Sequence, residues 1–138
     1  AVIPWGPLCG GLLSGKYNRD QQIEGARWQD GKDNANRRAT EETWDVLDHL
    51  QEMANDKGCT MSQLALAWNM AQPGVTAPII GPRTFEQIED NLGAVEVEMG
   101  TEDFSKIDEL VPPKGYVVRY YDEANAIDFK PHSHRSFA

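Results

Sequence analysis

Two short, mainly apolar segments constrain the fold of this chain more than any other feature. They are 1–5 and 75–80, and a glycine-containing turn follows each of them. Their length and composition predict buried β-strands, and the helical patterns between them predict a strand–helix–strand unit with parallel strands. Two parallel strands cannot form a stable sheet alone, because their edges and faces need cover. We therefore expect a chain that begins within a strand of a longer fold.

The segment between the two strands carries two helix-start signals. Thr40 precedes two glutamates and an apolar pattern of helical spacing, which predicts a helix that ends at Gly58. Residues 60–63 form a capping box in front of the apolar helix 64–71, and Pro73 with the glycine after it stops that helix.

Three further helical segments are predicted from similar signals. Residues 84–87 form a second capping box, which predicts a helix that runs to Gly93. Thr101 is expected to cap a helix over 102–110, and residues 12–17 can begin a short helix after the first strand. The sequence thus predicts an α/β unit over 1–111, followed by a weakly patterned tail over 112–138.

Length and charge exclude several classes of protein. The 138 residues fit one domain, and the net charge of −9 disfavours a general nucleic-acid or anionic-membrane surface. No apolar run approaches the roughly 18 residues that span a bilayer. Cys9 and Cys59 lack the spacing of metal ligands, and His132 and His134 in the tail have no cysteine or carboxylate cluster nearby, so we expect no metal site. Sparse cysteines suggest a reducing compartment, by default the cytoplasm.

The turn after the second strand is the first candidate binding site. Gly81 lets a phosphate approach the backbone, Arg83 offers a fork of donors, and Thr84 starts a helix whose free N–H groups attract anions. Side chains that can contact a purine follow on this helix, namely Gln87, Asp90 and Asn91. On the residues alone, a surface arginine on an ordinary strand–turn–helix fits equally well.

The loop after the first strand is the second candidate. Its glycines permit a ligand to approach the backbone, and Lys16 supplies a mobile positive charge for a phosphate. Trp5, at the end of the strand, can present a flat face to an aromatic ring. The loop lacks the spacing of a Walker loop or a dinucleotide fingerprint, so a packed tryptophan and a plain glycine-rich turn stay open as an alternative.

The order of these motifs resembles the aldo-keto reductase family over about residues 2–110. Residues 7–17 resemble the loop after the seventh strand of its barrel, and 63–68 with 72–76 resemble the helix and turn before the eighth. Residues 79–84, with Gln87 and residues 90–91, resemble its adenosine-phosphate segment. The resemblance implies the C-terminal portion of a (β/α)₈ TIM barrel, comprising the last two strands, their helices and a tail.

The resemblance also implies NADP(H) as the cofactor. Trp5 matches the position that stacks on the nicotinamide, Lys16 matches a pyrophosphate contact, and Arg83 matches a 2′-phosphate contact that favours NADP(H) over NAD(H). The full set of matching positions is Trp5, Pro7, Leu8, Cys9, Gly11, Lys16, Arg27, Gly81, Arg83, Gln87, Asp90 and Asn91.

The function implied is reduction of aldehydes or ketones to alcohols. The catalytic tyrosine, lysine, aspartate and histidine of the family lie on earlier strands, so we expect no catalytic residue in this chain. It should need the N-terminal barrel half, or self-association, to complete the fold. Two alternatives stay open: an NADP(H)-binding regulatory module, as in potassium-channel β subunits, and a purely structural half-barrel.

Overall fold

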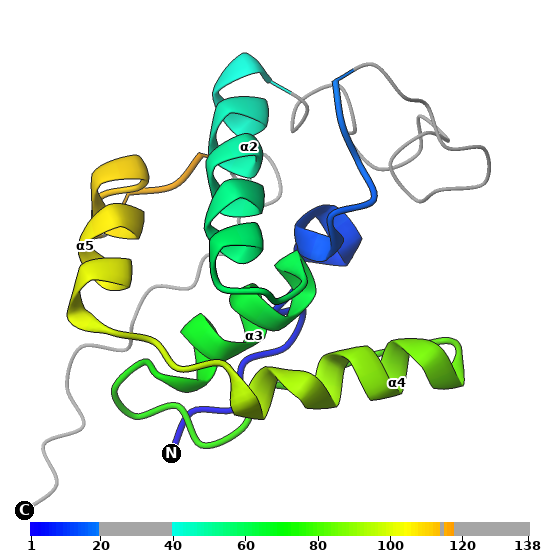
Figure 1. Ribbon diagram of the computed structural model, residues 1–138. Helices are drawn as coiled ribbons and strands as arrows, with labels where there is room; N and C mark the ends of the chain where they lie inside the picture. Colours follow the sequence, from blue (N-terminus) through cyan, green and yellow to red (C-terminus); the bar gives the residue numbers. More distant parts are fainter. Residues whose placement is uncertain (20–39, 114, 118–138) are drawn as a thin grey trace, which may run out of the picture.

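The structure is a computed structural model that describes residues 1–19, 40–113 and 115–117. Its helical elements, in chain order, are η1 (Cys9–Ser14), α2 (Glu41–Asp56), α3 (Met61–Met70), α4 (Phe85–Leu92), η2 (Gly93–Glu96) and α5 (Thr101–Leu110). Figure 1 shows α3 at the centre of the arrangement, with α2 and η1 above it and α4 projecting to one side. Arg27 and most of the predicted tail lie outside the described residues.

The two predicted strand segments pair in parallel, as expected, but only through two isolated bridges, and neither segment forms a regular strand. Val2 bridges Val75, and Trp5 bridges Ile79. Three backbone bonds join the segments: Val2 N donates to Gly74 O at 2.9 Å, Thr76 N donates to Val2 O at 2.8 Å, and Ile79 N donates to Pro4 O at 2.8 Å. Because the pairing is parallel, both segments end at the same edge.

The helices between the strands also follow the prediction. Thr40 caps α2, since its hydroxyl accepts from Thr43 N at 3.2 Å, and Gly58 follows the helix with a left-handed φ of 66°. The capping box at Thr60 is present and places the start of α3 at Met61, ahead of the purely apolar stretch.

A short helix forms after the first strand segment, as predicted, but it begins three residues before the predicted range of 12–17. It is the 3₁₀ helix η1, and the backbone is left-handed at Gly10 (φ 66°) and Gly11 (φ 96°). The helix ends before Tyr17 because Gly15 is also left-handed, with a φ of 74°, and such a residue reverses the sense of the turn. The apolar pattern alone did not show this interruption.

Two predicted helix caps differ in detail. Gly100, and not Thr101, is the N-cap of α5, and its N–H donates to the Asp103 carboxylate at 2.7 Å. Thr84 caps α4 as predicted, but the Gln87 side chain accepts from Arg83 N at 2.7 Å instead of closing a capping box. In both cases a side chain in the first turn accepts from a backbone N–H just before the helix.

The core lies where η1, α2 and α3 meet. Leu12, Leu47 and Met61 form a buried cluster, against which Tyr17 and Trp44 pack. One residue of the cluster comes from each element, so the loop after the first strand is anchored to both helices. This anchoring fixes the position of the predicted cofactor loop.

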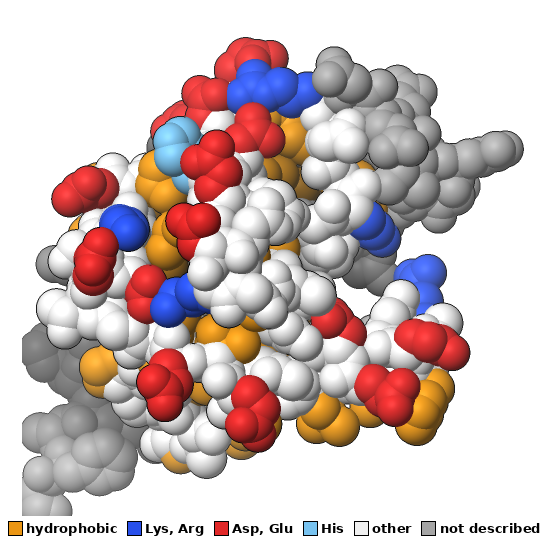
Figure 2. Space-filling view, viewed as in Figure 1, with side chains coloured by type: hydrophobic (Ala, Val, Ile, Leu, Met, Phe, Trp, Pro, Cys, Tyr) orange, Lys and Arg blue, Asp and Glu red, His pale blue; other side chains and the backbone are white. Residues whose placement is uncertain are grey.

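Much apolar surface remains exposed in the part of the chain that the structure describes. Trp5 is 64% exposed, and Phe85 and Leu92 on α4 are 66% and 57% exposed. Figure 2 shows hydrophobic side chains gathered along α4. Surface of this kind usually packs against further structure. None of the described helices is long and apolar enough to cross a membrane.

Candidate functional site

The two predicted binding loops leave the same edge of the strand pair. The bridge between Trp5 and Ile79 places the start of the first loop beside the turn at Gly81. Figure 2 shows a hollow between the η1 region and the projecting end of α4, with Lys and Arg side chains on both sides of it. The arrangement therefore presents positive charge to one open edge of a chain that is strongly acidic overall.

The first loop has a backbone that only small residues accommodate well. Gly11 is left-handed, and a Cβ built on it would lie 3.4 Å from both Cε and Nζ of Lys16. The Lys16 ammonium lies 4.9 Å from the centroid of the Tyr17 ring, which packs on the core. Lys16 is thus held over the loop that contains Pro7, Leu8 and Cys9.

The second loop leaves open space beside its backbone. A Cβ on Gly81 would meet no atom within 4 Å. Arg83, just before the N-cap of α4, and Gln87, in the first turn of the helix, are both exposed, and Thr84 accepts from Gln87 N at 3.3 Å. The Gln87 amide oxygen is occupied by Arg83 N, so of its polar groups the amide nitrogen is the better placed to contact a ligand.

The start of α4 favours negative charge. The pKa of Glu86 lies below its ordinary value, first because the carboxylate bonds its own backbone N–H and then because of the Thr84 hydroxyl. These donors belong to the helix terminus at which we predict a phosphate. One anion is therefore already stabilised at this position.

Asp90 and Asn91 lie deeper in the structure than the other predicted contacts. The Thr60 hydroxyl donates to the Asp90 carboxylate, at 3.0 Å to Oδ1 and 3.2 Å to Oδ2. Asn91 is only 8% exposed, whereas Arg83 and Gln87 are exposed. The predicted contacts on α4 therefore form an exposed pair near its start and a more buried pair near its end.

The sequence interpretation missed an ion-pair network beside the first loop. Arg19 bonds the carboxylates of Glu41, Asp45 and Asp48 on α2. Its pKa is raised above the ordinary value, chiefly by the bond to Asp45. The three acids recur at i, i+4 and i+7, so they share a helix face, and this spacing was the available signal.

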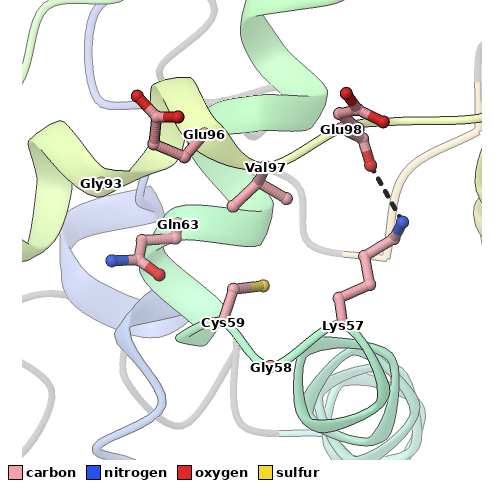
Figure 3. A pocket seen from close by; sticks show the side chains of 8 residues that line it. All are labelled: Lys57, Gly58, Cys59, Gln63, Gly93, Glu96, Val97 and Glu98. Carbon is pink, nitrogen blue, oxygen red and sulfur yellow. Dashed lines mark hydrogen bonds between the residues drawn. The ribbon is translucent and has the colours of Figure 1, made fainter.

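Two pockets lie away from this edge. One, of about 490 Å³, is shown in Figure 3 and is lined by Lys57, Gly58, Cys59, Gln63, Gly93, Glu96, Val97 and Glu98. The other, of about 610 Å³, has Trp68 and Phe104 in its wall. Neither contains a predicted cofactor residue, and the described residues hold no cluster of possible metal ligands. The candidate site is thus an open edge and not an enclosed cavity.

Comparison with known proteins identifies the family. Residues 1–112 match the sequence model of the Aldo/keto reductase family. The chain belongs to this family. Membership implies a TIM barrel, and the parallel pair of strands followed by helices is consistent with a portion of one.

Two relatives illustrate the range of the aldo/keto reductase match. The chain is 34% identical over 114 residues to the uncharacterized oxidoreductase YrpG of Bacillus subtilis (strain 168), covering 83% of this chain and 33% of that protein. It is 35% identical over 98 residues to a probable voltage-gated potassium channel subunit beta of Arabidopsis thaliana, covering 70% of this chain and 30% of that protein. The chain spans about a third of the length of these curated relatives.

Proposed function

We propose that this chain is the C-terminal, cofactor-binding part of an NADP(H)-dependent aldo-keto reductase that reduces aldehydes or ketones in the cytoplasm. Residues 1–111 would contribute the seventh and eighth barrel strands with their helices, and 112–138 a tail. The parallel pairing of Trp5 with Ile79 is the observation that carries the proposal, because it brings both candidate loops to one edge. Ligands of (β/α)₈ barrels bind at this C-terminal face of the strands.

The residues present fit a dinucleotide phosphate. The exposed face of Trp5 suits the nicotinamide ring, and Lys16 above Gly11 suits the pyrophosphate. Open space beside Gly81 and the donors of Arg83 suit the 2′-phosphate. On this proposal Pro7, Leu8, Cys9, Gly11 and Arg27 complete the pyrophosphate side, and Gln87, Asp90 and Asn91 the adenine side.

The role of the chain in the reaction would be binding and orientation. NADP(H) supplies or accepts the hydride when bound. Lys16 would hold the pyrophosphate of the cofactor and Arg83 its 2′-phosphate. Trp5 would determine which face of the nicotinamide ring is presented to the substrate. Tyr17 packs against the core cluster and does not match the position of the family's catalytic tyrosine. The catalytic groups would come from the N-terminal barrel half.

Arg83 provides the sharpest test of cofactor choice. In the protein that carries this chain, Arg83→Ala should weaken the binding free energy of NADPH by about 1–3 kcal/mol, because a charge-assisted hydrogen bond is lost. The dissociation constant for NADH should change little. Fluorescence titration with each cofactor measures both values.

The matched control is Lys106→Ala, which removes one positive charge from α5, where Lys106 pairs with Glu102. This variant should bind both cofactors as the parent does. An equal loss of NADPH and NADH affinity in Arg83→Ala would refute the 2′-phosphate assignment.

A regulatory role is the second candidate, and the match to a protein named as a potassium channel β subunit favours it. In that case the complete barrel would hold NADP(H) to sense redox state for a partner. Turnover of aldehydes and ketones with NADPH, measured beside cofactor affinity, separates the two roles. Tight binding without turnover would support regulation.

A further inference from the structure

Thr60 makes an unusual pair of hydrogen bonds at the start of α3. Its hydroxyl oxygen accepts from Gln63 N at 3.1 Å, which is the N-cap bond of the helix. The same hydroxyl donates its only proton to the Asp90 carboxylate, at 3.0 Å to the nearer oxygen. Because the cap occupies the oxygen as an acceptor, the proton is directed away from the helix and toward Asp90.

The Gln63 side chain also binds Asp90, through the backbone carbonyl of Asp90. Its side-chain oxygen accepts from Thr60 N at 3.1 Å, and its side-chain nitrogen donates to Asp90 O at 2.9 Å. Figure 3 shows the Gln63 side chain passing beside Gly93, where a Cβ would overlap the side-chain nitrogen. The capping box of α3 therefore fixes both the carboxylate and the carbonyl of Asp90.

These bonds matter because the apolar side of α4 has little support within the described residues. Phe85 and Leu92 are largely exposed, so the contacts of Asp90 with α3 contribute much of what sets the orientation of the helix. A carboxylate offers about four acceptor positions, and the Thr60 hydroxyl leaves some of them available. A second donor can therefore bind to a carboxylate that is already oriented.

We propose that Thr60 is a positioning residue for the adenine end of the cofactor: its hydroxyl orients the Asp90 carboxylate to accept from the exocyclic amine of the base. This inference rests on the proposed function, since it assigns a positioning residue to the same cofactor site. Thr60 itself does not touch the cofactor. It acts through Asp90, so its loss should weaken only cofactors whose base carries the exocyclic amine.

The test compares NADPH with reduced nicotinamide hypoxanthine dinucleotide phosphate, which has a carbonyl where adenine has the amine. Affinities are measured in the protein that carries this chain and in two variants. Thr60→Ser keeps both hydrogen bonds. Thr60→Gly places a residue that is well tolerated at the N-cap of α3 but has no hydroxyl to donate to Asp90, so the link is removed while the helix start is largely preserved.

We expect the parent and Thr60→Ser to prefer the adenine cofactor by about tenfold, because the hypoxanthine carbonyl would face a carboxylate. Thr60→Gly should reduce this preference to within about twofold. Circular dichroism melts confirm that each variant is folded. A purely structural role for Thr60 would weaken both cofactors equally and leave the preference intact, which overturns the inference.

Two other outcomes are also decisive. A parent that binds both cofactors equally well overturns the role of Asp90 as an amine acceptor, and with it that of Thr60, while the proposed function stands. A parent that binds neither cofactor refutes the proposed function itself, together with this role. The result for the parent thus separates failure of the two proposals.

Discussion

Hydrogen-bonding side chains determine the local geometry at the junction of α3 and α4. Sequence position alone treats Gln87 and Asp90 as equivalent polar residues on one helix. In the structure Gln87 bonds the backbone at Arg83, and Asp90 bonds Thr60 on another helix. The chemistry open to each residue therefore depends on which atoms the fold has already used.

Gly93 is predicted to be intolerant of even one additional carbon. Its backbone is not left-handed, so the reason is steric: a Cβ would displace the Gln63 side-chain nitrogen from Asp90 O. Gly93→Ala should lower the free energy of unfolding by about 1 kcal/mol, the value of one hydrogen bond. Urea denaturation measures the change.

The control for this substitution is Gly81→Ala. Gly81 has open space around it, so the added methyl group should change stability by less than about 0.5 kcal/mol. Equal destabilisation by the two substitutions would show that helix or loop propensity, and not contact with Gln63, is the cause.

The elements are joined by a few charged side chains that bridge between helices. Lys57, just after α2, donates to Glu98 O at 2.9 Å and pairs with Asp103 on α5 at 2.8 Å. Burial raises the pKa of Asp103, but the Lys57 ammonium and the Gly100 N–H outweigh it and hold the pKa below the ordinary 3.8. The link between α2 and α5 is therefore strongest when Asp103 is ionised.

Asp103 is expected to make stability acid-dependent. Because its pKa is lower in the folded state, the contribution is complete above about pH 4 and is lost as the pH falls through the depressed pKa. Asp103→Asn should be less stable than the parent at pH 6, and this difference should shrink as the pH falls below 4. Chemical denaturation across this range measures it.

Asp108→Asn makes the same change at an exposed position of the same helix and is the matched control. If it removes as much acid-dependent stability as Asp103→Asn does, then the pair with Lys57 is not the source.

At the scale of the whole molecule, the main feature is apolar surface without cover. Both strands present exposed apolar side chains, and so does the face of α4 that carries Phe85 and Leu92. A completed barrel would bury such surface, whereas the chain alone leaves it in contact with water. The core between η1, α2 and α3 is small by comparison.

The chain by itself is predicted to self-associate. Sedimentation velocity should show a mass that rises with concentration, because burial of the exposed faces is favourable by roughly 25 cal/mol per Å². Phe85→Glu with Leu92→Glu should reduce the association. In the protein that carries this chain, the same double substitution should instead lower stability, since there the face is expected to be buried. A monodisperse parent that melts cooperatively as a monomer would contradict the prediction.

Local signals in the sequence predicted three helix caps and the alternation of elements, but not the cap of α5 or the position of η1. Thr40, Thr60 and Thr84 cap helices as predicted, because a cap joins residues only three apart. The family motifs likewise located both candidate loops, and the parallel strands follow from the order of elements. Their roles in binding a cofactor remain predictions.

Only the tertiary structure decided how distant residues meet. The bond from Thr60 to Asp90 joins residues 30 positions apart, and the Arg19 network joins residues 22 to 29 apart. The left-handed backbone at Gly10 and Gly11 in η1 also could not be predicted from the apolar pattern, because glycine permits that conformation without requiring it. Such contacts depend on how whole helices pack, and packing is set by burial over many residues at once, which no short stretch of sequence specifies.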